Sequence, residues 1–231
     1  QNAMHSFEKV ISLDPTDITA YANLAAAYDM LKLYDKEIVT LKKVLMFNPE
    51  DKELRSALSN AYFNAERYEE AIDAAQCVVE IDDKDPQAYC NLGSCYSVRN
   101  MIDDAISAFK KASELAPDYS LPHTNLGTLY ANMGRPETAI KEFKLAVELN
   151  PGDVGAWLNL YNCYKDVGLM EDSQAAFSKY EALINEAPAT APTEGNNPSN
   201  IPGGVSQTGG YSGGGSMEGN APGLETLADS E

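Results

Sequence analysis

The chain has 231 residues, of which 35 are acidic and 17 are basic, giving a formal net charge of −18. This acidity argues against a nucleic-acid surface, which needs clustered Lys and Arg to displace counterions from phosphates. It argues equally against a polybasic membrane anchor. No apolar run in the sequence approaches the roughly 20 residues that cross a bilayer. We therefore expect no nucleic-acid partner and no direct membrane insertion.

An internal repeat of 34 residues runs through the chain. It is most visible in "NLGSCYS" at 91–97, "NLGTLYA" at 125–131 and "NLYNCYK" at 159–165. The stretch 1–17 fits the second half of a further unit. The full units are 18–51 (unit 1), 52–85 (unit 2), 86–119 (unit 3), 120–153 (unit 4) and 154–187 (unit 5).

Each unit carries two apolar stripes at helical spacing. In the first half a Leu is followed four residues later by a Tyr, as in Leu126 and Tyr130, which places both on one helical face. The second half repeats Ala, Ile and an aromatic residue, as in Ala139, Ile140 and Phe143. The pattern predicts two helices in each unit.

The residues between these halves are typical of helix ends. Gly134 and Gly168 separate the halves of units 4 and 5, where a left-handed residue is needed, and Asn100 takes the equivalent place in unit 3. Proline cannot continue a helix, and it closes the second helix at Pro15, Pro49, Pro117 and Pro151. Because one such helix pair cannot bury its apolar face alone, we expect the units to stack into an α-solenoid.

Two long stretches match a known repeat pattern, W-x2-L-G-x2-Y…A-x3-F…A…P. They are "AWLNLYNCYKDVG" from Ala156 and "HTNLGTLYANMGRPETAIKEFKLAVELNP" from His123. On these residues the sequence resembles the tetratricopeptide repeat family over about four fifths of its length. The departures from the pattern are Arg55 and His123 at aromatic or aliphatic places, Glu37 and Ser173 where Ala is expected, and Tyr161 in place of Gly.

The resemblance implies an all-α fold, a right-handed superhelix whose first helices line a concave groove that binds peptide segments of other proteins. The residues favour the same orientation, because the outer faces of the second helices are charged, as a solvated convex surface would be. The face of the first helices opposite the Leu and Tyr stripe is small, neutral and rich in amides. The charged residues on the outer faces of the second helices are Lys42, Lys43, Glu69, Glu70, Lys141, Glu142 and Lys144.

A row of asparagines follows this neutral face. Asn23, Asn91, Asn125 and Asn159 recur in register, and only Ala57 interrupts them. An amide side chain offers a donor and an acceptor, so it can pair with the backbone of an extended peptide. The resemblance adds that some family members are known for such an asparagine ladder. The candidate groove residues are Asn23, Asn60, Gln87, Asn91, Ser94, Thr124, Asn125, Thr128, Asn132, Asn159 and Asn162.

A structural interpretation of the same asparagines stays open. Each amide could instead bond a neighbouring helix and hold the geometry between units. A second pattern of the family, a Lys and Arg clamp for acidic chaperone C-termini, is not expected. The matching places carry neutral residues, among them Ala22, Asn60, Gln87 and Asn91.

The sequence offers little for catalysis or metal binding. The four cysteines, Cys77, Cys90, Cys95 and Cys163, form no CxxC pair and have no His at zinc-finger spacing. We expect unpaired thiols in helices, which favours a cytoplasmic location and leaves the periplasm open. The acidic stretch 81–86 lacks the Gly and the closing Glu of a calcium loop. Without a phosphate loop, nucleophile elbow or zinc-protease motif, we expect no metal, no cofactor and no enzyme activity.

The domain prediction is a repeat array over 1–187 and a tail over 188–231. The tail is acidic, rich in Gly, Pro and Ser and free of Lys and Arg, so we expect it to be disordered. The leading hypothesis is a non-enzymatic protein–protein interaction scaffold that binds extended peptide segments. The alternative is the substrate-recruiting arm of a larger multidomain enzyme, for example a glycosyltransferase. Because solenoids normally carry caps, we also expect a fragment of a longer array, with self-association through uncapped ends as a further hypothesis.

Overall fold

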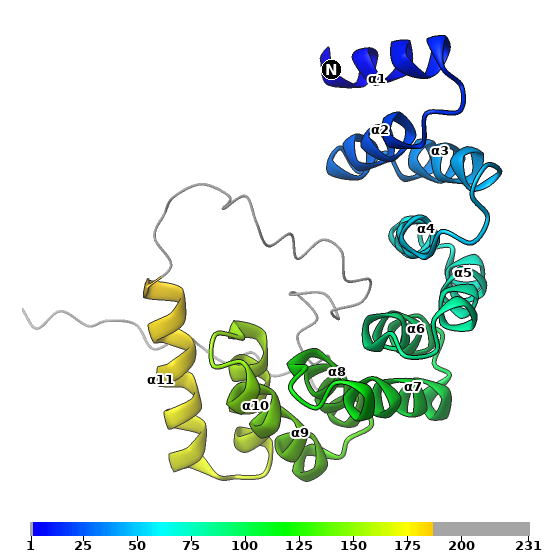
Figure 1. The fold of residues 1–231 in the computed structure, drawn as a ribbon. Coiled ribbons are helices and arrows are strands. Elements are labelled where there is room, and N and C mark those ends of the chain that lie inside the picture. The colour runs from blue at the N-terminus through cyan, green and yellow to red at the C-terminus, as the bar shows by residue number, and fades with distance from the viewer. Residues whose placement is uncertain (1, 187–231) are drawn as a thin grey trace, which may run out of the picture.

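The computed structural model describes residues 2–186, and within this range every regular element is a helix. The helices pair and stack into an arc, as an α-solenoid does (Figure 1). The predicted tail, 188–231, lies outside the described residues. In chain order the helices are α1 (Asn2–Leu13), α2 (Ile18–Met30), α3 (Tyr34–Leu45), α4 (Lys52–Asn64), α5 (Tyr68–Ile81), α6 (Pro86–Val98), α7 (Ile102–Leu115), α8 (Ser120–Asn132), α9 (Pro136–Leu149), α10 (Val154–Asp166) and α11 (Met170–Glu186).

Aspartates cap most of the first helices. At the N-termini of α2, α4, α6 and α10 an Asp side chain accepts a hydrogen bond from a backbone N–H of the first turn, which satisfies a donor that the helix itself leaves open. These residues recur at the unit boundaries, so capping and repeat register coincide. The four caps are Asp17, Asp51, Asp85 and Asp153.

The turn inside each unit passes through a left-handed residue. The prediction is confirmed for Gly134, Gly168 and Asn100, whose φ angles are 69°, 78° and 58°. Lys32 and Glu66 adopt the same conformation, with φ angles of 56° and 60°, although neither residue type favours a left-handed turn. A side chain with a Cβ is strained in this region, so units 1 and 2 fold at a local cost that units 4 and 5 avoid.

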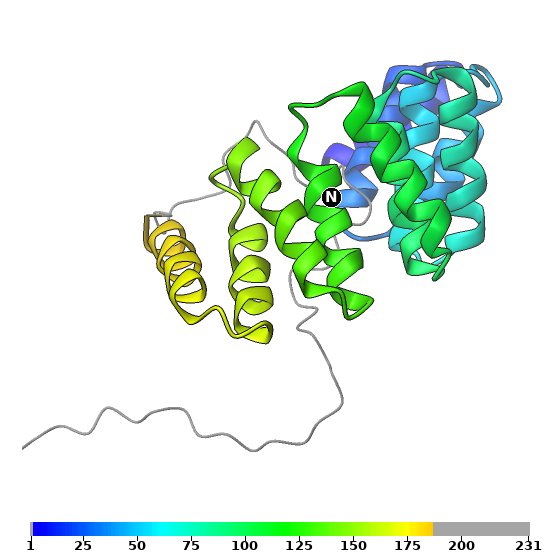
Figure 2. The same ribbon diagram turned by 90° about the horizontal axis from the view of Figure 1, so that it is seen from below.

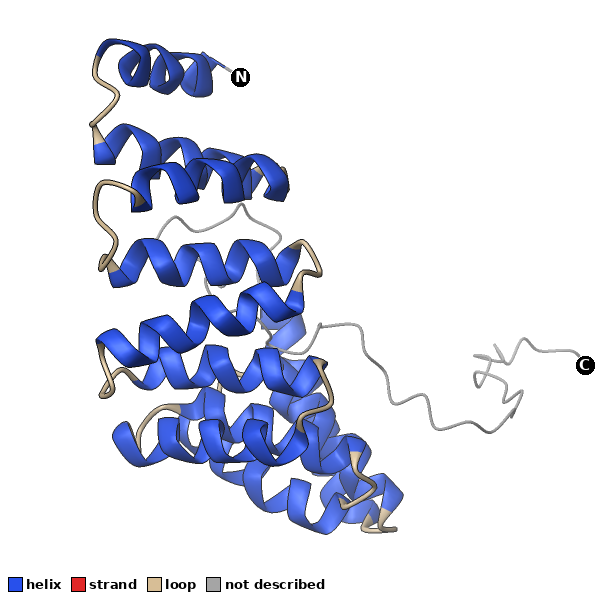
Figure 3. Ribbon diagram, turned by 90° about the vertical axis from the view of Figure 1, so that its right-hand side faces the viewer, coloured by secondary structure: helices blue, strands red, loops and turns tan. Residues whose placement is uncertain are grey.

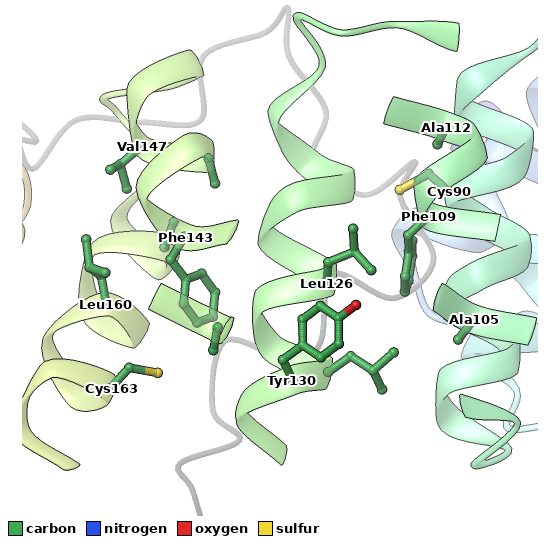
Figure 4. Packing of buried hydrophobic residues seen from close by; sticks show 14 of the residues in the cluster. Cys90, Ala105, Phe109, Ala112, Leu126, Tyr130, Phe143, Val147, Leu160 and Cys163 are labelled. Atoms are coloured by element: carbon green, nitrogen blue, oxygen red, sulfur yellow. The ribbon is translucent and has the colours of Figure 1, made fainter. Parts of the chain in front are cut away.

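Glycine is required where the two helices of units 3 and 4 cross. A Cβ added to Gly93 would lie 2.8 Å from the Phe109 ring, and one added to Gly127 would lie 2.7 Å from the Phe143 ring. Both rings are almost fully buried (Figure 4). Glycine therefore lets the phenylalanine of the second helix lie flat against the first helix, which gives these units close packing.

The sequence departures alter this contact in the outer units. Glu37 is 5 % exposed at the place where the next three units bury Ala71, Ala105 and Ala139 completely. Burial, with Asp29 nearby, raises the pKa of Glu37 to about 8. In unit 5, Tyr161 replaces the glycine and its ring stacks obliquely on Phe177, with 5.0 Å between the centroids.

The stack has an inner and an outer layer. Helices α2, α4, α6, α8 and α10 line the concave side of the arc, and α3, α5, α7 and α9 lie outside them (Figure 1). The turns between helices collect along two edges (Figure 3). Seen from below, units 4 and 5 lie to one side of the first units, as in a superhelix (Figure 2). None of the described helices is both long and apolar enough to span a membrane.

Candidate functional site

The inner helices of units 3 and 4 are uncharged. Helices α6 and α8 contain no Asp, Glu, Lys or Arg, whereas their outer partners α7 and α9 contain five such residues each. Because the inner helices face the concave side, the centre of that side is neutral in an otherwise acidic chain. In units 3 and 4, therefore, the charged residues lie on the outer helices and not on the inner ones.

The two central asparagines of the predicted row are buried. Asn91 and Asn125 are each 3 % exposed, because each faces the preceding unit: Asn91 lies beside Ser56 and Ser59 of α4, and Asn125 lies against α6. The Asn125 amide nitrogen donates to the Cys90 sulfur at 3.4 Å, and the Gln87 amide nitrogen donates to the Asn91 oxygen at 2.8 Å. The first of these contacts joins the first helices of consecutive units. This geometry favours the structural interpretation for the middle of the row.

Tyr119 completes the contact between units 3 and 4. It occupies the boundary place that Asp holds before the other first helices, and its side chain makes no capping bond to α8. Its hydroxyl instead donates to the Gln87 side-chain oxygen, and burial raises the pKa of Tyr119. Burial also raises the pKa of the neighbouring Cys90 thiol to about 12, which leaves it unreactive at neutral pH. Sequence reasoning missed Tyr119, although the broken aspartate series was a usable signal.

The remaining candidates differ in how far they reach solvent. Asn60 and Ser94 are buried, at 9 % and 2 % exposed. Asn23 and Asn132 are exposed. The half-buried candidates are Gln87, Thr124, Thr128, Asn159 and Asn162.

Helix α8 offers the most continuous accessible polar strip. Thr124, Thr128 and Asn132 follow one another at intervals of four residues, so they share one helical face. Thr128 donates to the Thr124 carbonyl at 2.9 Å, and Thr124 donates to the Asp153 carboxylate at 3.0 Å. The second bond ties the strip to the start of α10. These residues present hydroxyl and amide groups without a formal charge.

Other features of the described residues give no sign of catalysis. No group of three or more His, Cys, Asp or Glu side chains within 2–186 is placed to hold a metal ion. His123 is buried, and its Nδ1 lies 2.9 Å from Glu142 Oε2, inside unit 4. A cavity of about 490 Å³ lies between α1, α2 and α3, with Tyr21, Leu24 and Tyr28 in its wall, and no candidate groove residue lines it.

Sequence profiles of the tetratricopeptide repeat match residues 6–38, 86–119 and 108–141. With the helix pairs and the stacking described above, these matches show that the array is built of tetratricopeptide repeats. Comparison with curated protein sequences finds no match.

Several solved structures share the fold. The chain is 25 % identical to MamA over 70 % of this chain and 95 % of that one, with a TM-score of 0.62. The pilF protein of Pseudomonas aeruginosa is 18 % identical over 72 % of this chain and 76 % of its own, with a TM-score of 0.65. YrrB, described as a TPR protein with an unusual peptide-binding site, is 20 % identical over 78 % and 93 %, with a TM-score of 0.56. The last two likenesses concern the fold alone.

Proposed function

We propose that the chain is a non-enzymatic protein–protein interaction scaffold that binds an extended, largely uncharged peptide segment of another protein on the concave side of units 3 to 5. The observation that carries this proposal is the absence of charged residues from α6 and α8 in a chain of net charge −18. A charged peptide would lose hydration on this surface without gaining an ion pair. An uncharged peptide would lose less hydration free energy and could still form hydrogen bonds with this surface.

The candidate residues would have two roles, which are to space the inner helices and to bind the peptide backbone. Asn91 faces α4 and Asn125 faces α6, and both are buried, so they would set the spacing of the inner helices. The accessible hydroxyls and amides would pair with the peptide backbone, whose N–H and C=O groups need partners once water is displaced. These are Gln87, Thr124, Thr128, Asn132, Asn159 and Asn162 at the centre, with Asn23 at the far end of the row.

The tetratricopeptide repeats support the proposal, as does the peptide-binding site for which YrrB is described. A search for partners can begin from a random library of 12-residue peptides displayed on phage and selected on the immobilised full chain. The proposal predicts enriched sequences that are poor in Asp, Glu, Lys and Arg. Enrichment of strongly charged sequences would contradict it.

A pair of matched variants tests the surface. Thr128→Arg/Asn132→Arg places two cations on the inner face, and Glu137→Arg/Lys141→Arg makes the same net charge change at two exposed places on outer helix α9 with the same spacing. We expect the selected peptides to lose at least tenfold in affinity for the first variant and to keep their affinity for the second. Equal binding by both variants would refute the inner surface as the site.

A further inference from the structure

The hydrophobic core of the described residues falls into two clusters. One cluster joins α2 to α5 and ends at Cys95 on α6. The other begins at Cys90 on the same helix and continues through α7 to α11 (Figure 4). The division therefore falls on α6, the first helix of unit 3, beside its junction with α5, although the helices stack there without a break.

Small and polar side chains fill the junction itself. Buried Ala75, Val78, Ala88 and Leu92 belong to neither cluster. Ser56, Ser59 and Asn91 line the junction together with the first three of these residues, and the space between them has no room for a water molecule. Small and polar side chains bury little apolar surface, so this junction gains less from apolar burial than one filled by a large ring.

The sequence of unit 2 explains the small side chains at the junction. Ser59 and Ala75 stand where unit 3 has Gly93 and Phe109 and where unit 4 has Gly127 and Phe143, at intervals of 34 residues. Unit 2 therefore has no aromatic ring where units 3 and 4 bury one between their helices. Ser59 donates instead to the Ala71 carbonyl of its own unit at 2.9 Å and lies within hydrogen-bonding reach of the Cys95 thiol.

Polar contacts hold the junction at its surface. Lys52 at the start of α4 pairs with Asp82 at 2.7 Å and with Asp85, the cap of α6, at 3.4 Å. At the other end of these helices Arg99 pairs with Glu69. Gln76 on α5 donates to the Tyr96 hydroxyl on α6 at 2.8 Å. The paired side chains are partly or largely exposed, so dissolved salt screens the ion pairs.

We propose that the stack consists of two separately cooperative blocks, α1–α5 and α6–α11, connected by a polar, salt-sensitive joint between α5 and α6. In a repeat protein the stability of the whole depends on the interfaces between neighbours, and a weak interface divides the array. The α1–α5 block opens first, because it contains the buried acid Glu37 and the strained Lys32 and Glu66. The neutral inner surface of α6 and α8 stays folded when this block opens.

Hydrogen exchange of the full chain, read by mass spectrometry at increasing urea concentrations, tests the proposal. We expect peptides from α1–α5 to lose protection together at a lower urea concentration than peptides from α6–α11. The boundary should lie at residues 82–86, and 1 M KCl should widen the separation because it screens the ion pairs. A single step for all helices, or a boundary at another junction, would overturn the proposal.

A variant that places a large ring in unit 2 gives the sharper test. Ser59→Gly/Ala75→Phe copies the packing of units 3 and 4 into unit 2, and we expect it to merge the two exchange steps into one. Ala75→Phe alone is the matched control and should not merge them, because Ser59 keeps the side chain that the ring must displace. Two separate steps in the folded double variant would count against the packing explanation.

A surface variant keeps the joint testable if the double variant does not fold. Lys52→Ala/Arg99→Ala removes the ion pairs of the joint, and we expect exchange in α1–α5 to accelerate about threefold to tenfold. Lys110→Ala/Lys111→Ala on α7 removes two charges that make no ion pair across the joint and should leave exchange in α1–α5 unchanged. Equal effects of the two surface variants would overturn the role of the ion pairs.

Discussion

Units 1 and 4 have the same helix pair and turn, but different residues fill the space between their helices. In unit 4, Gly127 admits the Phe143 ring and Ala139 lies under the crossing, with both side chains completely buried. In unit 1, Leu41 takes the place of the ring and the acid Glu37 takes the place of the alanine. The same repeat backbone therefore forms with inner side chains that pack with very different stability. The chemical groups that the unit exposes to solvent differ as well.

The largest effect should follow from emptying the well-filled unit. Phe143→Ala removes a ring that is 0 % exposed and leaves a cavity between α8 and α9, so we expect the free energy of unfolding to fall by about 3–5 kcal/mol. Urea titration followed by far-UV circular dichroism and by fluorescence of Trp157 measures the loss, which should be concentrated in the α6–α11 block. A loss below about 1 kcal/mol would show that unit 4 is no better packed than unit 1.

The second prediction repairs unit 1. The pKa of Glu37 is about 8 in the folded chain against an ordinary 4.5, so the folded state binds more protons than the unfolded state between these values. Its contribution to stability is present below pH 4.5 and is lost as the pH rises to about 8. Glu37→Ala should remove this pH dependence and raise the free energy of unfolding at pH 8 on the order of 2–4 kcal/mol.

Thermal unfolding of the two proteins from pH 5 to pH 9 gives the comparison. Glu37→Gln is the matched control, because it keeps the shape of the side chain and removes only the titrating proton. It should flatten the pH profile in the same way, with a smaller gain in stability. Parallel profiles for the original and the Ala variant would show that Glu37 does not titrate in this window.

The smallest effect concerns the turns. Lys32→Gly and Glu66→Gly should each stabilise the chain by about 1 kcal/mol, because glycine adopts a positive φ without strain. Gly134→Lys, the reverse change in unit 4, should cost about the same amount. Melting temperatures of the three variants check the sign, and a loss of stability in Lys32→Gly would mean that its side chain outweighs the backbone strain.

Local patterns predicted the fold well, because the 34-residue period, the Leu and Tyr stripe and the turn residues Gly134 and Gly168 act within one unit. The candidate site depended on contacts between units, which a single helix does not reveal. A helical wheel put Asn91 and Asn125 on an outer face, but only the packed stack shows that neighbouring helices cover them. The role of Tyr119 was missed for the same reason, since its partner Gln87 lies in the sequence 32 residues away.

Hydrogen exchange of the full chain with and without a selected uncharged peptide tests whether the inner helices bind it. We expect added peptide to slow exchange mainly in α6, α8 and α10, the inner helices that carry the accessible Gln, Thr and Asn residues. The Thr128→Arg/Asn132→Arg variant should show no such slowing, and Glu137→Arg/Lys141→Arg should behave like the original chain. Slowed exchange confined to α7 and α9, or to the α1–α3 region, would contradict a peptide-binding inner surface.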